Sequence, residues 1–180
     1  MDDLKKFLVG GVITLVLGGT AYTFTQQDVI NNFAEDTGVS QEEATEYVNN
    51  ITDSDLVPYQ EIGTGLVNDG QLTVDAAEEI DCINYEYDWE TTSLSCYDGK
   101  EQMRRVGEDD IALGNSYIKL DSETSTTGDI QETIAIIDKV NTNYNLPIIQ
   151  AIMTPSEIDE HKKTHSYNKS LLKSALDSQK

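Results

Sequence analysis

The feature that most constrains this chain is an uncharged, largely apolar segment near its N-terminus, from Phe7 to Phe24. No charged residue occurs from Phe7 to Gln27, and Lys5 and Lys6 come directly before the segment. Eighteen residues in an α-helix rise about 27 Å, which is close to the hydrocarbon core of a bilayer, about 30 Å thick. The segment therefore predicts a transmembrane helix that acts as a signal-anchor.

The positions of the basic residues predict how this helix is oriented. After Lys6, no Lys or Arg occurs until Lys100. Because basic flanks stay on the cytoplasmic side, we expect a single-pass protein of the cell membrane. Its N-terminus would be cytoplasmic and the bulk of the chain extracytoplasmic, either periplasmic or extracellular. The alternatives are a secretory signal cleaved near Gly19-Thr20-Ala21 and a buried helix of a soluble domain.

Small residues recur along the predicted membrane helix. Gly10, Thr14 and Gly18 are four residues apart and would share one helix face. Such spacing lets a second transmembrane helix approach closely. The sequence thus predicts packing against another membrane protein or self-assembly through this face, although glycine is also common in membrane helices in general.

The charge of the chain is strongly negative and unevenly distributed. The sequence has 33 acidic and 12 basic residues, for a formal net charge of -21. Residues 7–99 carry 18 of the acids and no base. This distribution argues against nucleic acid as a partner, because phosphate binding needs clustered Lys and Arg. A basic protein surface or a divalent cation would be compatible with it, as would a merely solvated acidic surface.

One short segment is similar to the centre of an EF-hand calcium loop. It runs from Asn68 to Thr73 and has Gly70 at the expected turn position. The positions that should supply ligands before this glycine are Gly65 and Val67, and the final carboxylate position is Ala76. We therefore expect a simple Asp-Gly turn here.

Two helices are expected after the apolar segment, at residues 26–36 and 40–50. Ser40 and Glu43 form a capping box for the second one. The stretch from Ala34 to Val48 resembles a helix-turn-helix signature. Its second helix carries acids and no base, so we expect a packed helical corner and no binding to DNA.

The middle of the chain predicts an antiparallel sheet of three or four strands, at residues 82–89, 94–97, 101–106 and 116–120. Asp98-Gly99 is a strong hairpin signal between two of them. Tyr85, Tyr87 and Trp89 alternate along the first strand. Such a row is typical of a buried sheet face, and a sugar-binding surface is the alternative.

The last third predicts a helix at residues 129–141, an edge strand at 146–153 and a closing helix. Thr154 and Glu157 form a capping box for the closing helix. The expected fold is therefore α+β, with a single transmembrane helix and packed helices around the sheet. We expect an anchor (1–25), a helical hairpin (26–56), an acidic extracytoplasmic α+β domain (57–155) and a C-terminal helix (156–180).

Cys82 and Cys96 are the only cysteines. They lie on predicted neighbouring strands and would enclose a loop of about 15 residues, for which a disulfide contributes about 3 kcal/mol. An even pair outside the cytoplasm is usually oxidised. The sequence predicts a disulfide, with two free thiols as the alternative.

His161 and His165 are the only histidines and lie four residues apart on the closing helix. With Glu157 they form a spacing that can hold zinc or copper. The alternative is an exposed polar helix face. No catalytic triad, phosphate loop or dinucleotide motif is present in the sequence, so we expect neither an enzyme nor a cofactor.

These observations together predict a membrane-anchored, non-enzymatic accessory subunit that mediates protein–protein assembly outside the cytoplasm. A filament or virion subunit is the first alternative. The order of an apolar helix, a helical stretch and a disulfide-bearing sheet resembles that of type IV pilins, although Phe7 to Phe24 lacks that family's glutamate. A binding module for sugar or metal is the second alternative.

Overall fold

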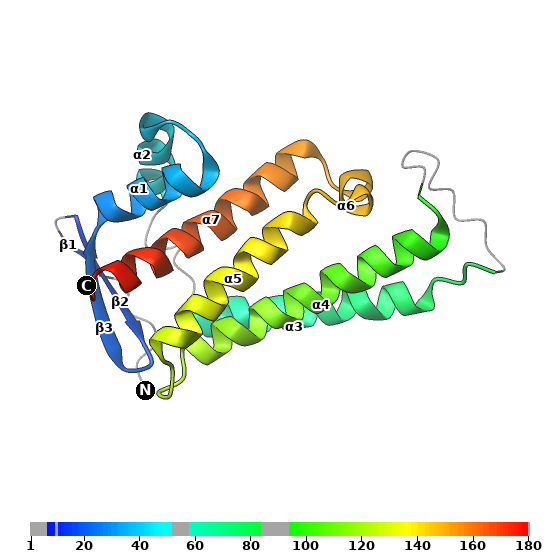
Figure 1. The fold of residues 1–180 in the computed structure, drawn as a ribbon, viewed down its shortest axis with the longest axis horizontal. Helices are drawn as coiled ribbons and strands as arrows, with labels where there is room; N and C mark the ends of the chain where they lie inside the picture. Colours follow the sequence, from blue (N-terminus) through cyan, green and yellow to red (C-terminus); the bar gives the residue numbers. More distant parts are fainter. Residues whose placement is uncertain (1–6, 10, 52–57, 84–93, 180) are drawn as a thin grey trace.

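The computed structural model describes residues 7–9, 11–51, 58–83 and 94–179 (Figure 1). The elements in this part of the chain are β1 (Phe7–Val9), β2 (Val12–Leu17), β3 (Thr20–Thr25), α1 (Gln26–Thr37), α2 (Gln41–Asn50), α3 (Tyr59–Glu79), α4 (Cys96–Leu120), α5 (Thr127–Asn143), α6 (Pro147–Ile152) and α7 (Pro155–Asp177). The sheet lies at one end of the long helices, where the C-terminus also lies (Figure 1). The fold is mainly helical.

The N-terminal apolar segment forms an antiparallel sheet of order β1-β2-β3. Leu17 pairs with Thr20, and the two residues between them, Gly18 and Gly19, have φ of 55° and 74°. A two-residue turn with positive φ at both positions joins antiparallel strands with the natural twist, and glycine adopts it without strain. Along β2 and β3, buried and exposed side chains alternate, as in a half-buried sheet.

The prediction of a transmembrane signal-anchor is therefore wrong. The segment is broken by the Gly18-Gly19 turn and is rich in β-branched residues, which favour strands. None of the helices in the described residues is long and apolar enough to cross a membrane. The single-pass membrane location and the cytoplasmic N-terminus, which were inferred from that helix, are not supported.

The predicted helix-packing face also has no counterpart. Thr14 lies in β2, and Gly18 lies in the turn, where its N–H donates to the Leu120 carbonyl at 3.1 Å. A Cβ atom on Gly18 would lie 2.6 Å from the Ser125 side chain, so the turn docks closely on the segment after α4. Gly10 lies outside the described residues.

The sheet expected in the middle of the chain is wrong as well. Residues 96–120 form the single helix α4, which replaces three of the four predicted strands and places Asp98-Gly99 in its first turn. Ser95 caps this helix by accepting a hydrogen bond from the Asp98 N–H. Most of the first predicted strand, including Tyr85, Tyr87 and Trp89, lies outside the described residues. The expected edge strand at 146–153 is α6.

Four helices lie where the sequence predicted them, as α1, α2, α5 and α7. The capping boxes of Ser40 with Glu43 and of Thr154 with Glu157 are both formed. The N–H and side-chain contacts of these boxes fix the starts of α2 and α7.

The helices α3 and α4 form a closely packed antiparallel hairpin (Figure 1). Gly63 faces Gly114 and Gly70 faces Gly107, and a Cβ atom on any of them would lie 2.5 to 2.6 Å from a backbone oxygen of the opposite helix. These glycines are therefore required by the approach of the two backbones. The Asn68–Thr73 segment lies inside α3, so the expected Asp-Gly turn is not formed.

The predicted disulfide between Cys82 and Cys96 is confirmed, with a Cα–Cα distance of 5.6 Å. It joins the chain just after α3 to the first residue of α4. Nearby, Lys100 Nζ donates to the carbonyls of Glu78 and Ile80 at 3.2 and 3.1 Å, which satisfies the end of α3.

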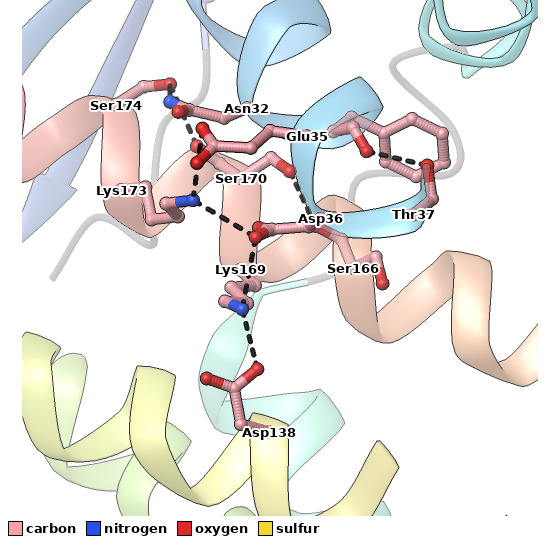
Figure 2. Close-up of polar contacts among 11 residues, drawn as sticks. Asn32, Glu35, Asp36, Thr37, Asp138, Ser166, Lys169, Ser170, Lys173 and Ser174 are labelled. Atoms are coloured by element: carbon pink, nitrogen blue, oxygen red, sulfur yellow. Dashed lines mark hydrogen bonds and ion pairs between the residues drawn. The ribbon is translucent and has the colours of Figure 1, made fainter. Parts of the chain in front are cut away.

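Lysines of α7 join three helices (Figure 2). Lys169 Nζ lies 3.2 Å from Asp36 of α1 and 2.6 Å from Asp138 of α5. Lys173 Nζ lies 3.0 Å from the same Asp36 oxygen and 3.8 Å from Glu35. The C-terminal helix thus supplies the positive charge that the acidic α1 lacks.

Candidate functional site

A cavity of about 730 Å³ lies between the α3–α4 hairpin and the helices α5 and α7. Residues of α2 and α6 also contribute to its wall. It is larger than two other hollows between the described residues, whose volumes are about 270 and 410 Å³. Its volume lies within the range of about 300–1,000 Å³ that is usual for small-molecule sites.

The wall of the cavity is mainly apolar and aromatic. Its aliphatic side chains are Ile51, Ile62, Leu66, Val106, Val140, Ile149 and Met153. Its aromatic side chains are Tyr47, Tyr117, Tyr144, Tyr167, His161 and His165. None of the described residues that line the cavity is Lys or Arg, whereas Asp69, Asp110 and Glu160 are acidic.

Two neighbouring aspartates of α4 have different environments. Asp109 is 4% exposed, and its carboxylate accepts hydrogen bonds from Lys139 Nζ at 2.6 Å and Asn143 Nδ2 at 2.9 Å. Asp110 lines the cavity and makes no hydrogen bond or ion pair with the described residues. Burial, together with the charges of Asp109 and Asp69, raises the pKa of Asp110 to about 7. The cavity therefore contains a carboxylate whose charge is uncompensated.

Two further polar atoms belong to residues of the wall, are themselves buried from solvent, and have no hydrogen-bond partner in the part of the chain that the structure describes. They are the hydroxyl oxygen of Tyr117 and Oδ1 of Asn143. The Tyr117 side chain is fully buried, and its ring stacks on Tyr59 with centroids 5.0 Å apart. Asn143 is 3% exposed, and only its Nδ2 is engaged, by Asp109. Buried polar groups without partners cost free energy, which a ligand can recover.

The wall also contains a hydrogen-bonded pair, Tyr144 at the end of α5 and His165 of α7. The Tyr144 hydroxyl and His165 Nε2 are 3.1 Å apart, which is a hydrogen bond. Burial, and then the neighbouring His161, lowers the pKa of His165 to about 4, so this imidazole is neutral at pH 7. Burial also raises the pKa of Tyr144. This pair is thus a neutral, mutually satisfied part of the wall.

The structure brings two of the three predicted metal ligands together. His161 and His165 both line the cavity. His165 is buried, so the alternative of an exposed polar helix face is wrong for that residue. Glu157 instead accepts hydrogen bonds from the N–H and hydroxyl of Thr154. Among the described residues, no three His, Cys, Asp or Glu side chains are placed to hold a metal ion.

Sequence reasoning missed the residues that α4 and α5 contribute to the cavity. Val106, Asp110 and Tyr117 lie at helical spacing on one face of α4. That periodicity was divided between two predicted strands, so it went unnoticed. A usable signal was present in the paired glycines seven residues apart, which repeat in both α3 and α4 and are typical of closely packed helices.

No protein-family model, curated protein or solved structure matches this chain.

Proposed function

We propose that this protein binds a small organic molecule with an apolar body in the cavity between α3–α4 and α5–α7. The observation that carries this proposal is a mainly apolar cavity whose wall holds polar groups without partners in the described residues. Cavities of this size with a few convergent polar groups are the usual form of a ligand site. The unpartnered Tyr117 hydroxyl, Asn143 Oδ1 and Asp110 carboxylate would orient the ligand.

This proposal keeps the binding-module interpretation and changes its ligand class. The predicted sugar surface used Tyr85, Tyr87 and Trp89, which lie outside the described residues. Mostly apolar walls favour an apolar ligand over a sugar, whose hydroxyls need many polar partners. The predicted roles in protein–protein assembly and in filament formation stay predictions, and the part of their argument that used a membrane helix no longer applies.

The direct test is fluorescence titration with Nile red, a neutral dye that brightens in apolar surroundings. The wild-type protein should bind about one dye per chain with saturation. Val106→Phe, which fills the cavity from α4, should weaken binding about tenfold, since the added ring occupies ligand space.

The matched control is Val12→Phe, the same change at a 40% exposed position of β2 outside the cavity wall. It should leave the dye affinity unchanged. Thermal melts of both variants would verify folding. If the wild type binds no dye, or if both variants lose affinity equally, the cavity is not a ligand site of this kind.

A further inference from the structure

Three residues of the cavity wall, Asp110, Tyr117 and Asn143, offer acceptors without a donor among the described residues. The Asp110 carboxylate accepts hydrogen bonds when ionised, and Asn143 Oδ1 can only accept. The Tyr117 hydroxyl has free lone pairs as well as its proton. A ligand that completes this set must therefore bring hydrogen-bond donors, and an ammonium group has three donors and no acceptor.

The charge of the cavity leads to the same ligand class. Asp69, Asp110 and Glu160 contribute three carboxylates to the wall, and none of its described residues is Lys or Arg. Arg105 of α4 and Lys139 of α5 lie on the two helices that contribute Asp110 and Asn143 to the wall. Both are directed to Asp109, at 3.9 and 2.6 Å, and not to Asp110. An anionic ligand would meet only repulsion here, whereas a cation would compensate Asp110.

The aromatic rings supply a third, independent element. Tyr47, Tyr117, Tyr144 and Tyr167 all contribute to the wall. One face of Tyr47 is stacked on Phe33 and one face of Tyr117 on Tyr59. The remaining faces of such rings attract cations within about 6 Å, and the attraction grows when water is excluded. An apolar cavity with several tyrosines and the half-buried Asp110 carboxylate therefore suits an organic cation better than a neutral molecule.

We infer that the ligand of this cavity is an organic amine, an ammonium group on an apolar body, with the Asp110 carboxylate as its counter-ion and Asn143 and Tyr117 as hydrogen-bond acceptors. This inference rests on the proposed function, since it needs the cavity to admit a ligand. Asp110 fixes the charged end, and the aliphatic wall holds the apolar end.

The test compares three probes of the same shape by calorimetry at pH 8, namely 4-phenylbutylamine, 4-phenylbutanol and 4-phenylbutyrate. The amine should bind wild-type protein at least about tenfold more tightly than the alcohol, and the carboxylate should bind most weakly. Asp110→Asn should reduce the preference for the amine over the alcohol to about onefold, while the alcohol keeps its affinity.

Two further variants separate a specific site from the general negative charge of the chain. Glu132→Gln also removes one negative charge, but from an α5 side chain that is 62% exposed, and it should leave the amine preference unchanged. Tyr117→Phe removes only the unpartnered hydroxyl and should weaken amine binding about threefold with little effect on the alcohol.

The outcomes distinguish the two proposals. If the alcohol binds as tightly as the amine to wild-type protein, or if Asp110→Asn keeps the amine preference, the inferred ligand class is wrong and the apolar binding function stands. If neither probe nor Nile red binds, both proposals are overturned.

Discussion

Asp110 couples the stability of the fold to pH at the scale of a single residue. Its pKa is raised from 3.8 to about 7, so between these values the folded protein binds this proton more tightly than the unfolded chain does. The stabilisation that the protonated Asp110 provides is therefore lost as pH rises from about 4 to about 7, and it is absent above pH 7. His165, whose pKa is lowered from 6.5 to about 4, acts in the opposite sense, because its stabilisation is lost as pH falls.

Asp110→Asn should consequently stabilise the protein in a pH-dependent way. At pH 8 the wild type has an uncompensated carboxylate in the cavity, whereas the variant has a neutral amide. The melting temperature of the variant should therefore be about 3 °C higher than that of the wild type. Near pH 4 the wild-type carboxyl is protonated in the folded state, and the difference should nearly vanish. Thermal unfolding followed by circular dichroism at both pH values measures this.

The comparison needs a control, because several ionisable groups surround this residue. Those in or beside the cavity are Asp69 of α3, Asp109 of α4, Tyr144 at the end of α5, and Glu160, His161 and His165 of α7. They are unchanged in Glu132→Gln, which should shift the melting temperature by less than about 1 °C at either pH. If Asp110→Asn raises the melting temperature equally at pH 4 and pH 8, the raised pKa of Asp110 is not the cause of the stabilisation.

The candidate site was only partly predictable at this scale. The pair His161 and His165 drew attention because histidine is rare in this chain, and both residues do line the cavity. Asp110 could not be singled out, since it is one of 33 acids and its neighbour Asp109 has the same sequence context. Only the packing shows that Asp109 meets Lys139 and Asn143 while Asp110 meets the cavity.

At the scale of the elements, the α3–α4 hairpin depends on the absence of side chains along its seam. Glycine inside a helix costs about 1 kcal/mol relative to alanine, so four facing glycines are unfavourable locally. The close approach of the two backbones compensates for this cost through extensive contacts. The hairpin forms the wall of the cavity that carries Asp69, Asp110 and Tyr117.

Gly70→Ala should destabilise the fold by about 2 kcal/mol. Its new Cβ would lie 2.6 Å from the Gly107 carbonyl oxygen, and the helices would have to separate. The matched control on the same helix is Gly65→Ala, where no atom lies within 4 Å of the new Cβ. That change should stabilise by about 0.5–1 kcal/mol. Urea unfolding measures the change in unfolding free energy of both variants. Equal changes of the same sign would contradict a close approach of α3 and α4 at Gly70.

The disulfide closes the open end of the same hairpin by joining Cys82 and Cys96, which are 14 residues apart in sequence. Its reduction should lower the free energy of unfolding by about 3 kcal/mol, because the unfolded chain regains the entropy of an open loop of this size. The double variant Cys82→Ser with Cys96→Ser should reproduce the loss without a reductant. A reductant should leave the urea midpoint of the double variant unchanged. If it also leaves the midpoint of the wild type unchanged, the bridge contributes nothing to stability.

The elements show where sequence reasoning succeeded. The helices α1 and α5 were predicted from apolar periodicity, α7 from a capping box and α2 from both, and in the structure all four begin at a capping box. The prediction of a membrane helix at 7–24 was wrong because length and lack of charge were given more weight than its glycine pairs, which mark turns between strands. The prediction of strands within residues 96–120 was wrong because Asp98-Gly99 was interpreted as a turn, although Ser95 before it is a helix cap.

At the scale of the whole molecule, the uneven charge of the sequence has a structural counterpart. The acidic α1 contributes Asp36 to the bundle, where it is nearly buried, and the positive charge it needs comes from the other end of the chain. Lys169 and Lys173 of α7 share one oxygen of Asp36, and Lys169 also reaches Asp138 of α5 (Figure 2). The same α7 presents His161 and His165 to the cavity, so the ion pairs and the site depend on one helix.

Lys169→Met therefore tests how strongly the ends of the chain are held together. The Lys169 side chain is 13% exposed, and its removal leaves the carboxylates of Asp36 and Asp138 less compensated, so we expect a loss of about 2 kcal/mol in unfolding free energy. Lys163→Met on the same helix removes an exposed pair with Asp159 and should cost less than about 0.5 kcal/mol. Because α7 forms one side of the cavity, Lys169→Met should also weaken Nile red binding at temperatures near its melting transition, and Lys163→Met should not. Equal stability losses in urea would mean that the Lys169 pairs contribute no more than an exposed ion pair.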